Sequence, residues 1–324
     1  MSDADATGNP PTVLITGATA GIGANAAKRL AARGWDVLVN GRNRERGEAL
    51  VDEIRVAGNQ ATFFRADFAD PEGVHTLADA VRDHTDTLDT LVLNAALSSS
   101  ECAEGWDGVE LTFAVNQLAP YLLAHELLDR VQAAPAGRIV ITSSAIHTRG
   151  ELPIDPSAST GESEPTESST TEKSPTETAT ADSTPALDTA QLACTDDYDA
   201  FGAYARSKLA NLCFAAELDE RLPDVPVTAF HPGFVPGSGL YRDVGLPLRA
   251  FIRLTDLLPF VGTSVADGAD PIVHLVDDEI DVDAGIYYDN TEPKDPDPRV
   301  HDRTHRRALW NTCADLTEID PDWT

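Results

Sequence analysis

Short, mainly apolar runs alternate with longer amphipathic stretches along almost the whole chain. Such runs are typical of strands buried on both faces of a parallel sheet, and parallel strands need a helical crossover between them. We therefore predict an α/β fold, a Rossmann-type doubly wound parallel sheet covered by helices. Strands are predicted at 12–18, 35–41, 61–67, 88–96, 137–145, 225–233 and 284–290. Helices are predicted to end near 33 and to cover 44–57, 71–84, 108–134, 198–222, 246–258, 264–277 and 302–316.

This alternation stops at about residue 151, where a Ser/Thr/Glu/Pro tract with almost nothing apolar begins. Such a composition cannot bury enough apolar surface to fold, so we predict a disordered acidic insertion at about 151–195. It is either a tolerated solvated loop or a mobile flap over the active site. A chain of 324 residues is compatible with one large domain or two small ones, and we favour one. The predicted domain covers 12–324, after an acidic tail at 1–11.

The chain is strongly acidic, with 54 Asp and Glu against 24 Lys and Arg and a formal net charge of −30. That balance argues against binding to nucleic acid or to anionic membranes. An acidic surface poor in Lys resembles that of cytoplasmic proteins from halophilic microbes, although the acidic insertion accounts for part of the charge.

Cys102, Cys194, Cys213 and Cys313 are widely separated and form no C-x-x-C pair. The spacing therefore indicates neither a disulfide framework nor a zinc site, and a reducing cytoplasm fits best. The first residues are acidic and polar, unlike a signal peptide, and no apolar run reaches the roughly 20 residues of a membrane span. We expect a soluble cytoplasmic protein without a membrane or metal partner.

The glycine-rich stretch TGATAGIG at 16–23 stands where the first predicted strand passes into the first predicted helix. Gly17, Gly21 and Gly23 permit a tight turn, a close approach of backbone to a pyrophosphate, and helix packing on the strand. The start of that helix offers N–H groups and positive dipole to phosphates. The stretch predicts nucleotide binding.

A second motif, GAYARSKLA at 202–210, puts Tyr204 and Lys208 four positions apart in a predicted helix. Both side chains can then point at one ligand. A free phenol has a pKa of about 10, too high for ready proton exchange at neutral pH, and a neighbouring ammonium lowers that pKa. The pair predicts proton transfer; the alternative is two ordinary residues on a solvated helix face.

Together with Ser143 and Ser144 at the end of the strand predicted at 137–145, these motifs resemble the short-chain dehydrogenase/reductase family over roughly 11–320, excluding the insertion. GSGLYRD at 237–243, GIYYDN at 285–290 and the Leu309–Trp310 pair are similar to the retinol dehydrogenase and protochlorophyllide reductase branches. The resemblance implies an oxidoreductase that moves a hydride between a nicotinamide and a carbonyl or carbinol carbon.

The resemblance also implies a role for each matching residue. Tyr204 would exchange a proton with the substrate, Ser144 would hold the substrate oxygen, and Lys208 would tune Tyr204 and bind the cofactor ribose. Asn116 would hold a water that links the lysine to solvent; alternatively it is a capped polar residue in a buried helix. Implied cofactor contacts are Gly17, Thr19, Gly21, Ile22, Gly23, Asp67, Phe68, Asn94, Ala95, Ser143, Tyr204, Lys208, Pro232, Gly233 and Val235. Ala96 departs from the family's usual N-A-G.

The second strand indicates which cofactor is used. An acidic residue at its end would bind a ribose 2′-hydroxyl, whereas a basic one accommodates a 2′-phosphate. This chain has Gly41 in that place, followed by Arg42, Arg44 and Arg46. We predict NADP(H), with NAD(H) as the alternative, and Arg42 as the phosphate ligand. We expect Arg46 only to solubilise the following helix.

The substrate is less well defined. The region after the strand at 225–233 is apolar, which suggests a bulky hydrophobic aldehyde, ketone or alcohol; core packing or a homo-oligomer contact explains it equally well. Its apolar residues are Phe234, Leu240, Tyr241, Leu246, Phe251 and Leu254. Two other functions stay open: a dinucleotide sensor without chemistry, and an interaction protein that acts through the acidic tract.

Overall fold

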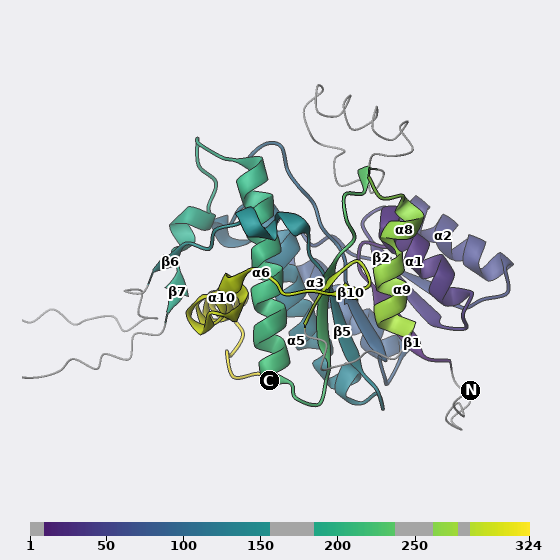
Figure 1. The fold of residues 1–324 in the computed structure, drawn as a ribbon. Coiled ribbons are helices and arrows are strands. Elements are labelled where there is room, and N and C mark those ends of the chain that lie inside the picture. The colour runs from purple at the N-terminus through teal and green to yellow at the C-terminus, as the bar shows by residue number, and fades with distance from the viewer. Residues whose placement is uncertain (1–9, 156–184, 237–261, 278–285) are drawn as a thin grey trace, which may run out of the picture.

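Parallel strands form the centre of the molecule (Figure 1). The computed structural model describes residues 10–155, 185–236, 262–277 and 286–324, and its main sheet has eight strands in the order β10-β9-β8-β5-β4-β1-β2-β3. Every neighbouring pair is parallel except β9 and β10. The predicted doubly wound Rossmann-type sheet is confirmed. The strands are β1 (Thr12–Ile15), β2 (Asp36–Gly41), β3 (Ala61–Arg65), β4 (Thr90–Leu93), β5 (Arg138–Thr142), β8 (Val227–His231), β9 (Tyr287–Asp289) and β10 (Glu292–Pro293).

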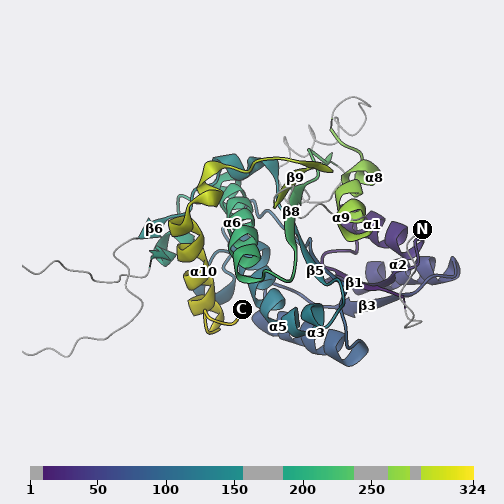
Figure 2. The same cartoon turned by 60° about the horizontal axis from the view of Figure 1, so that its bottom comes forward.

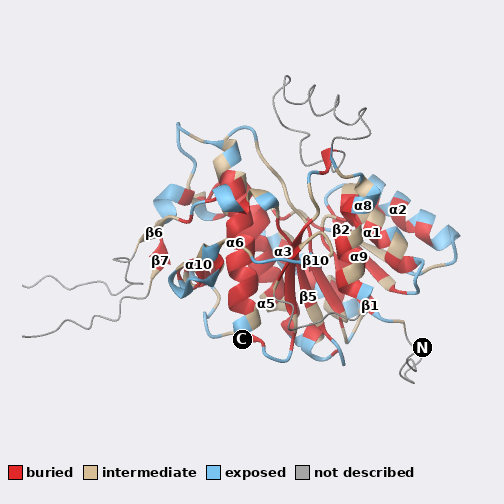
Figure 3. Ribbon diagram, in the orientation of Figure 1, coloured by how far each residue is buried: buried red, intermediate tan, exposed pale blue. Residues whose placement is uncertain are grey.

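Helices cover both faces of this sheet (Figures 1 and 2). One face packs against α1, α2 and α9, and the other against α3, α5 and α6, with one buried apolar cluster on each side (Figure 3). The longer helices are α1 (Gly21–Ala31), α2 (Arg44–Val56), α3 (Pro71–His84), α5 (Ala119–Gln132), α6 (Ala200–Arg221), α9 (Asp270–Asp277) and α10 (Arg303–Thr317). The short ones are α4 (Leu111–Phe113), α8 (Val265–Gly268), the 3-10 turns η1 (Trp106–Gly108), η3 (Ala145–Arg149), η4 (Thr189–Leu192) and η7 (Pro298–His301), and the π-helical turn η2 (Ala114–Leu118).

Polar side chains fix where several helices begin. Asn43, Asp70, Asp199 and Asp302 each accept a hydrogen bond from a backbone N–H in the first turn of the helix that follows. Such caps satisfy N–H groups that have no partner inside the helix. They explain why α2, α3, α6 and α10 begin close to the predicted positions.

The helix predicted at 108–134 is broken into three parts. Glu110 caps α4 by accepting hydrogen bonds from Thr112 N (2.7 Å) and Phe113 N (2.8 Å). The π-helical turn η2 follows, and α5 then begins next to Pro120. Proline has no N–H to donate to the preceding turn, which favours an irregular turn here.

The range predicted for the disordered insertion, 151–195, includes structured residues at both of its ends. Strands β6 (Ile154–Asp155) and β7 (Ala186–Leu187) pair antiparallel, and η4 follows them. Leu152, Leu187 and Leu192 are buried, so these few apolar residues are enough to fix the ends of the segment. Its acidic middle, 156–184, lies outside the described residues, as do the tail at 1–9, the helix predicted at 246–258 and the first residues of the strand predicted at 284–290.

The C-terminal helix α10 packs along α6. Trp310 stacks on Trp323 with ring centres 5.1 Å apart, and Tyr121 meets Trp310 edge-on at 5.1 Å. The Arg221 guanidinium lies 4.2 Å from the Trp310 ring centre. The C-terminal end of α6 is therefore covered by α10.

Candidate active site

The carboxyl ends of the central strands border a cleft of about 660 Å³. Sequence analysis identified most of its lining; of the predicted site residues, Gly21 and Asn116 do not line it. The predicted residues that do are Gly17, Thr19, Ile22, Gly23, Arg42, Asp67, Phe68, Asn94, Ala95, Ser143, Ser144, Tyr204, Lys208, Pro232, Gly233 and Val235. A cleft at this edge of a doubly wound sheet is the expected ligand site of the fold.

The glycine loop joins β1 to α1 at the floor of this cleft. Gly17 has φ +65°, and a Cβ there would lie 2.7 Å from Ala95 Cα, so neither the conformation nor the space suits a side chain. At Gly23 a Cβ would lie 2.7 Å from Asn94 Nδ2. The first turn of α1 has no acidic residue and no side-chain cap, so its N–H groups face the cleft without a competing carboxylate.

Asn94 ties the loop after β4 to the glycine loop. Its Nδ2 donates to Thr16 O (2.8 Å), and the Thr16 hydroxyl accepts hydrogen bonds from the backbone N–H groups of Asn94 (2.8 Å) and Ala95 (3.0 Å). The side chain of Asn94 thus fixes the backbone against which a cofactor would lie.

At the other end of the cleft, the residues after β2 are basic. A side chain at position 41 would be crowded, because a Cβ added to Gly41 would lie 2.5 Å from Thr19 Cγ2. Arg42 lines the cleft and lies 3.9 Å from the Asp67 carboxylate. Arg46, which was expected only to solubilise α2, also lines the cleft. Arg44 points elsewhere and pairs with Glu48 at 3.3 Å.

Tyr204 and Lys208 lie one turn apart on α6, and both line the cleft. The ammonium nitrogen of Lys208 is 5.6 Å from the centre of the Tyr204 ring. Lys208 is 2% exposed and donates hydrogen bonds to Thr142 O and Asn211 Oδ1, both at 3.0 Å. Burial lowers the pKa of Lys208 to about 7.

The two serines after β5 differ in their contacts. The Ser143 hydroxyl donates to the backbone carbonyl of Lys208 (2.9 Å) and so anchors α6 to the sheet. The Ser144 hydroxyl oxygen accepts from Ile146 N at 3.5 Å and caps η3, which leaves its O–H to donate into the cleft. Ser144 is therefore better placed than Ser143 to hold a substrate oxygen.

Asn116 lies behind the cleft, in the π-helical turn η2. Its Oδ1 accepts from Leu97 N (2.9 Å), while its Nδ2 donates to Leu97 O (2.9 Å) and to the Ser207 hydroxyl (3.0 Å). Its side chain thus holds the loop after β4 against α6. Its backbone carbonyl accepts from Asn211 Nδ2 at 2.7 Å. Asn211 was not among the predicted site residues; the available signal was a polar residue one turn after Lys208 on the same helix face.

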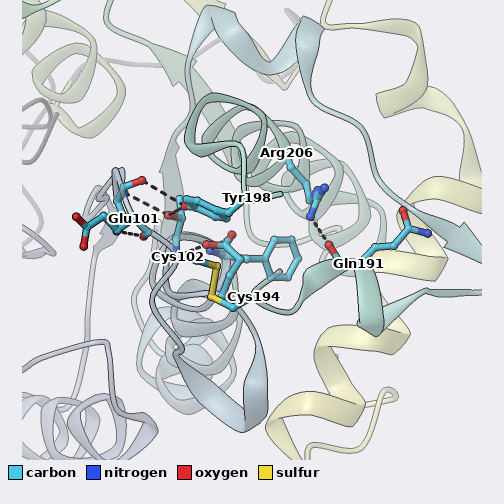
Figure 4. Close-up of a disulfide and its surroundings, with 10 residues drawn as sticks. Glu101, Cys102, Gln191, Cys194, Tyr198 and Arg206 are labelled. Atoms are coloured by element: carbon cyan, nitrogen blue, oxygen red, sulfur yellow. Dashed lines mark hydrogen bonds between the residues drawn. A yellow bond between two sulfur atoms is a disulfide. The ribbon is translucent and has the colours of Figure 1, made fainter. Parts of the chain in front are cut away.

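The cysteine spacing indicated no disulfide framework, and for one pair of cysteines this expectation is wrong. Cys102 and Cys194 form a disulfide with Cα atoms 5.6 Å apart, joining the segment after β4 to the segment before α6 (Figure 4). In the same region Tyr198 donates to Ser99 O (3.3 Å) and Arg206 to Gln191 O (2.6 Å). The two cysteines are 92 residues apart, so the fold alone brings them together. Cys213 and Cys313 are buried and unpaired.

The described residues contain neither a membrane-spanning helix nor a cluster of metal ligands. Within them no helix is both long and apolar enough to span a bilayer, and no group of three potential metal ligands occurs. The cytoplasmic prediction loses the support it drew from the cysteines, because disulfides persist mainly in oxidising compartments.

Known proteins are similar to this chain in sequence and in fold. The family described as short chain dehydrogenase matches residues 11–153. The chain is 31% identical to dehydrogenase/reductase SDR family member 13 of Bos taurus, over 96% of this chain and 74% of that protein. It is 30% identical to retinol dehydrogenase 13 of Mus musculus, over 95% of this chain and 84% of that protein. A short-chain dehydrogenase from Sphingobium yanoikuyae in complex with NADPH has the same fold, with a TM-score of 0.56 at 23% identity over 82% of this chain and 84% of that one. The protein belongs to the short-chain dehydrogenase family.

Proposed function

We propose that this protein is an NADP(H)-dependent oxidoreductase that interconverts a carbonyl and an alcohol on a bulky hydrophobic substrate. The observation that carries the proposal is that Tyr204, Lys208 and Ser144 line the same cleft as the glycine loop. A protein that only sensed a dinucleotide would need the glycine loop but not these three residues together.

The glycine loop fits a dinucleotide pyrophosphate. Gly17 turns the chain tightly against Ala95, and the uncapped start of α1 offers backbone N–H groups and the positive end of a helix dipole to phosphate oxygens. Thr19 and Ile22 would border the pyrophosphate, and Gly233 and Val235 would lie past the nicotinamide. When bound, the nicotinamide supplies or accepts the hydride.

The side chains of the cleft handle the proton. In the direction of reduction, Tyr204 gives its phenolic proton to the carbonyl oxygen while the Ser144 O–H donates a hydrogen bond to the same oxygen. Lys208, when protonated, stabilises the phenolate that Tyr204 becomes when it gives up its proton. The buried position of Lys208 strengthens this effect, because water screens the charge little.

Arg42 and Arg46 support the choice of NADP(H) over NAD(H). Both line the end of the cleft where the adenosine ribose would lie, and position 41 has no carboxylate. Guanidinium groups bind phosphate oxygens in a bidentate manner, which suits a 2′-phosphate. The solved structure from Sphingobium yanoikuyae, which holds NADPH, is in keeping with this choice.

The hydrophobic substrate class has two supports. Retinol dehydrogenase 13, a relative over most of both chains, is named for an apolar alcohol. Phe234, 43% exposed, follows Gly233 at the edge of the cleft. The other apolar residues predicted for this region lie outside the described ranges.

We extend the proposal to the surroundings in which the enzyme works. A net charge of −30 suits a protein that stays hydrated in concentrated salt, and a cytoplasm rich in salt would meet that condition. Screening of the repulsion between carboxylates should then raise stability as salt is added.

The proposal is tested by following the oxidation of NADPH and, separately, of NADH with a panel of hydrophobic aldehydes and ketones in molar KCl. We expect turnover with NADPH and a preference of about tenfold or more in kcat/KM over NADH. Tight NADPH binding without turnover on any member of the panel would favour the dinucleotide sensor instead.

A further inference from the structure

The catalytic lysine of the proposed function is held by a buried polar chain that the glycine loop and the Tyr-x-x-x-Lys motif do not include. Lys208 has two hydrogen-bond acceptors, Thr142 O on β5 and Asn211 Oδ1 on α6. An ammonium has three N–H groups, so one remains on the side of Tyr204 and the cleft. The position of Asn211 therefore decides where that third N–H points.

The orientation of the Asn211 amide is fixed by its neighbours. Its Nδ2 donates to Asn116 O (2.7 Å) and to Gln117 Oε1 (3.1 Å). Both partners are acceptors, so the NH₂ group must face them and the oxygen must face Lys208. Asn211 is 1% exposed and Gln117 is fully buried, so water does not compete for these contacts.

The sequence of η2 explains why the Asn116 carbonyl is open to Asn211. In a regular α-helix this carbonyl would accept from the N–H four residues later, and that residue is Pro120, which has none. Gln117 is held in turn from α10, because its Nε2 donates to Cys313 Sγ at 3.8 Å. The polar chain thus runs from the C-terminal helix through η2 and α6 to the lysine.

Asn211 also helps to stabilise the buried charge of Lys208. Among the described residues no carboxylate pairs with this lysine, and burial is the cause that lowers its pKa. Tyr204 on α6 is the titratable group that faces it, while Thr142 on β5 and Asn211 on α6 offer neutral oxygens. Those two oxygens are what keeps a buried ammonium stable here.

We infer that Asn211 is a positioning residue, which aims the Lys208 ammonium at Tyr204 and donates to the backbone carbonyl of Asn116, the residue that the resemblance expects to hold a relay water. The catalytic meaning of this inference rests on the proposed function, but the geometry does not.

The test measures the pKa of Lys208 directly, by NMR of the full-length protein with ¹³C at lysine Cε. The chain has four lysines, Lys28, Lys173, Lys208 and Lys294, and Lys208→Met assigns the signal. Lys28 and Lys294, with side chains 43% and 52% exposed, serve as internal references. The variants are Asn211→Leu, which removes the acceptor and excludes water, and Asn211→Ala, which leaves space for water. Leu212→Ala, a buried neighbour on α6 outside the polar chain, is the structural control.

We expect Asn211→Leu to lower the pKa of Lys208 by about one unit or more, the size of a lost hydrogen bond to a charged group. Asn211→Ala should shift it in the same direction by less, and Leu212→Ala should cost stability without moving it. An unchanged pKa of Lys208 in both Asn211 variants would overturn the inference; if the Leu variant does not fold, the Ala variant decides. Because the titration needs no substrate, absence of turnover in the wild type would contradict the proposed function without affecting this result.

Discussion

The ammonium nitrogen of Lys208 lies 5.6 Å from the centre of the Tyr204 ring, in a part of α6 from which water is almost excluded. Burying a charge without a counter-charge is unfavourable, and the low pKa of Lys208 reflects that cost. A buried group with a strongly shifted pKa is typical of a functional site, where a residue can serve the chemistry although it lowers the stability of the fold.

The cost should appear as a pH dependence of stability. Burial lowers the pKa of Lys208 from 10.5 to about 7, so between these values the unfolded chain binds more protons at this residue than the folded chain. The free energy of unfolding should therefore rise with pH in this window, by up to about 1.4 kcal/mol per pH unit. Chemical denaturation of the cofactor-free protein should show this rise in the wild type. Lys208→Met should lack it, and equal slopes would show that Lys208 is not buried as a charge.

Ser144→Ala should lower kcat by about a hundredfold, because the substrate oxygen loses a preorganised hydrogen-bond donor. Affinity for NADPH, measured by fluorescence titration, should change little. Thr148→Ala is the matched control, since this hydroxyl lies in the same turn η3 but donates to Ala145 O on the surface. A Ser144→Ala enzyme as active as the Thr148→Ala enzyme would remove Ser144 from the mechanism.

Arg42→Ala and Arg46→Ala should each raise the KM for NADPH by about tenfold and leave the KM for NADH nearly unchanged, because NADH lacks the 2′-phosphate. Arg44→Ala removes the same charge from a neighbouring position, on the same helix as Arg46, but Arg44 does not line the cleft. If Arg44→Ala had as large an effect as the other two, general electrostatic attraction would explain the preference instead of a phosphate site.

The disulfide between Cys102 and Cys194 predicts a thiol count and a stability change. Under denaturing, non-reducing conditions the protein should show the two thiols of Cys213 and Cys313, and four after reduction. Reduction should lower the free energy of unfolding by up to about 4 kcal/mol, since the bond closes a long loop. Four reactive thiols before reduction would mean that the bond does not form in solution. Cys102→Ser, which cannot form it, gives the stability of the open form.

Much of the fold could be predicted from the sequence because the features that specify it are local. Each strand of the main sheet from β1 to β8 is an apolar run long enough to recognise, and the caps of α2, α3, α6 and α10 stand beside the residues they cap. The glycine loop and the Tyr204–Lys208 pair are short motifs whose chemistry depends on spacing within one turn or one helix. The pocket therefore contains nearly all the residues expected from these motifs.

What the sequence did not predict depends on contacts between distant segments. Cys102 and Cys194 are 92 residues apart, and no spacing rule connects them. Asn211 binds η2, an element that was expected to be regular helix. One end of the predicted insertion is structured because Leu187 and Leu192 pack in the core, although the acidic residues near them in the sequence favour a solvated loop. In each case tertiary packing decides what local composition leaves open.

The central claim is that Tyr204 exchanges a proton with the substrate, and Tyr204→Phe tests it most directly. This change removes a single oxygen from a side chain that lines the cleft. The measurement is a single-turnover experiment in which wild type and Tyr204→Phe are loaded with NADPH and mixed with a carbonyl substrate found in the panel. The account predicts that both bind NADPH with similar affinity, while the rate of NADPH oxidation falls by about a hundredfold or more in the variant. Oxidation of NADPH at the wild-type rate by Tyr204→Phe would contradict it.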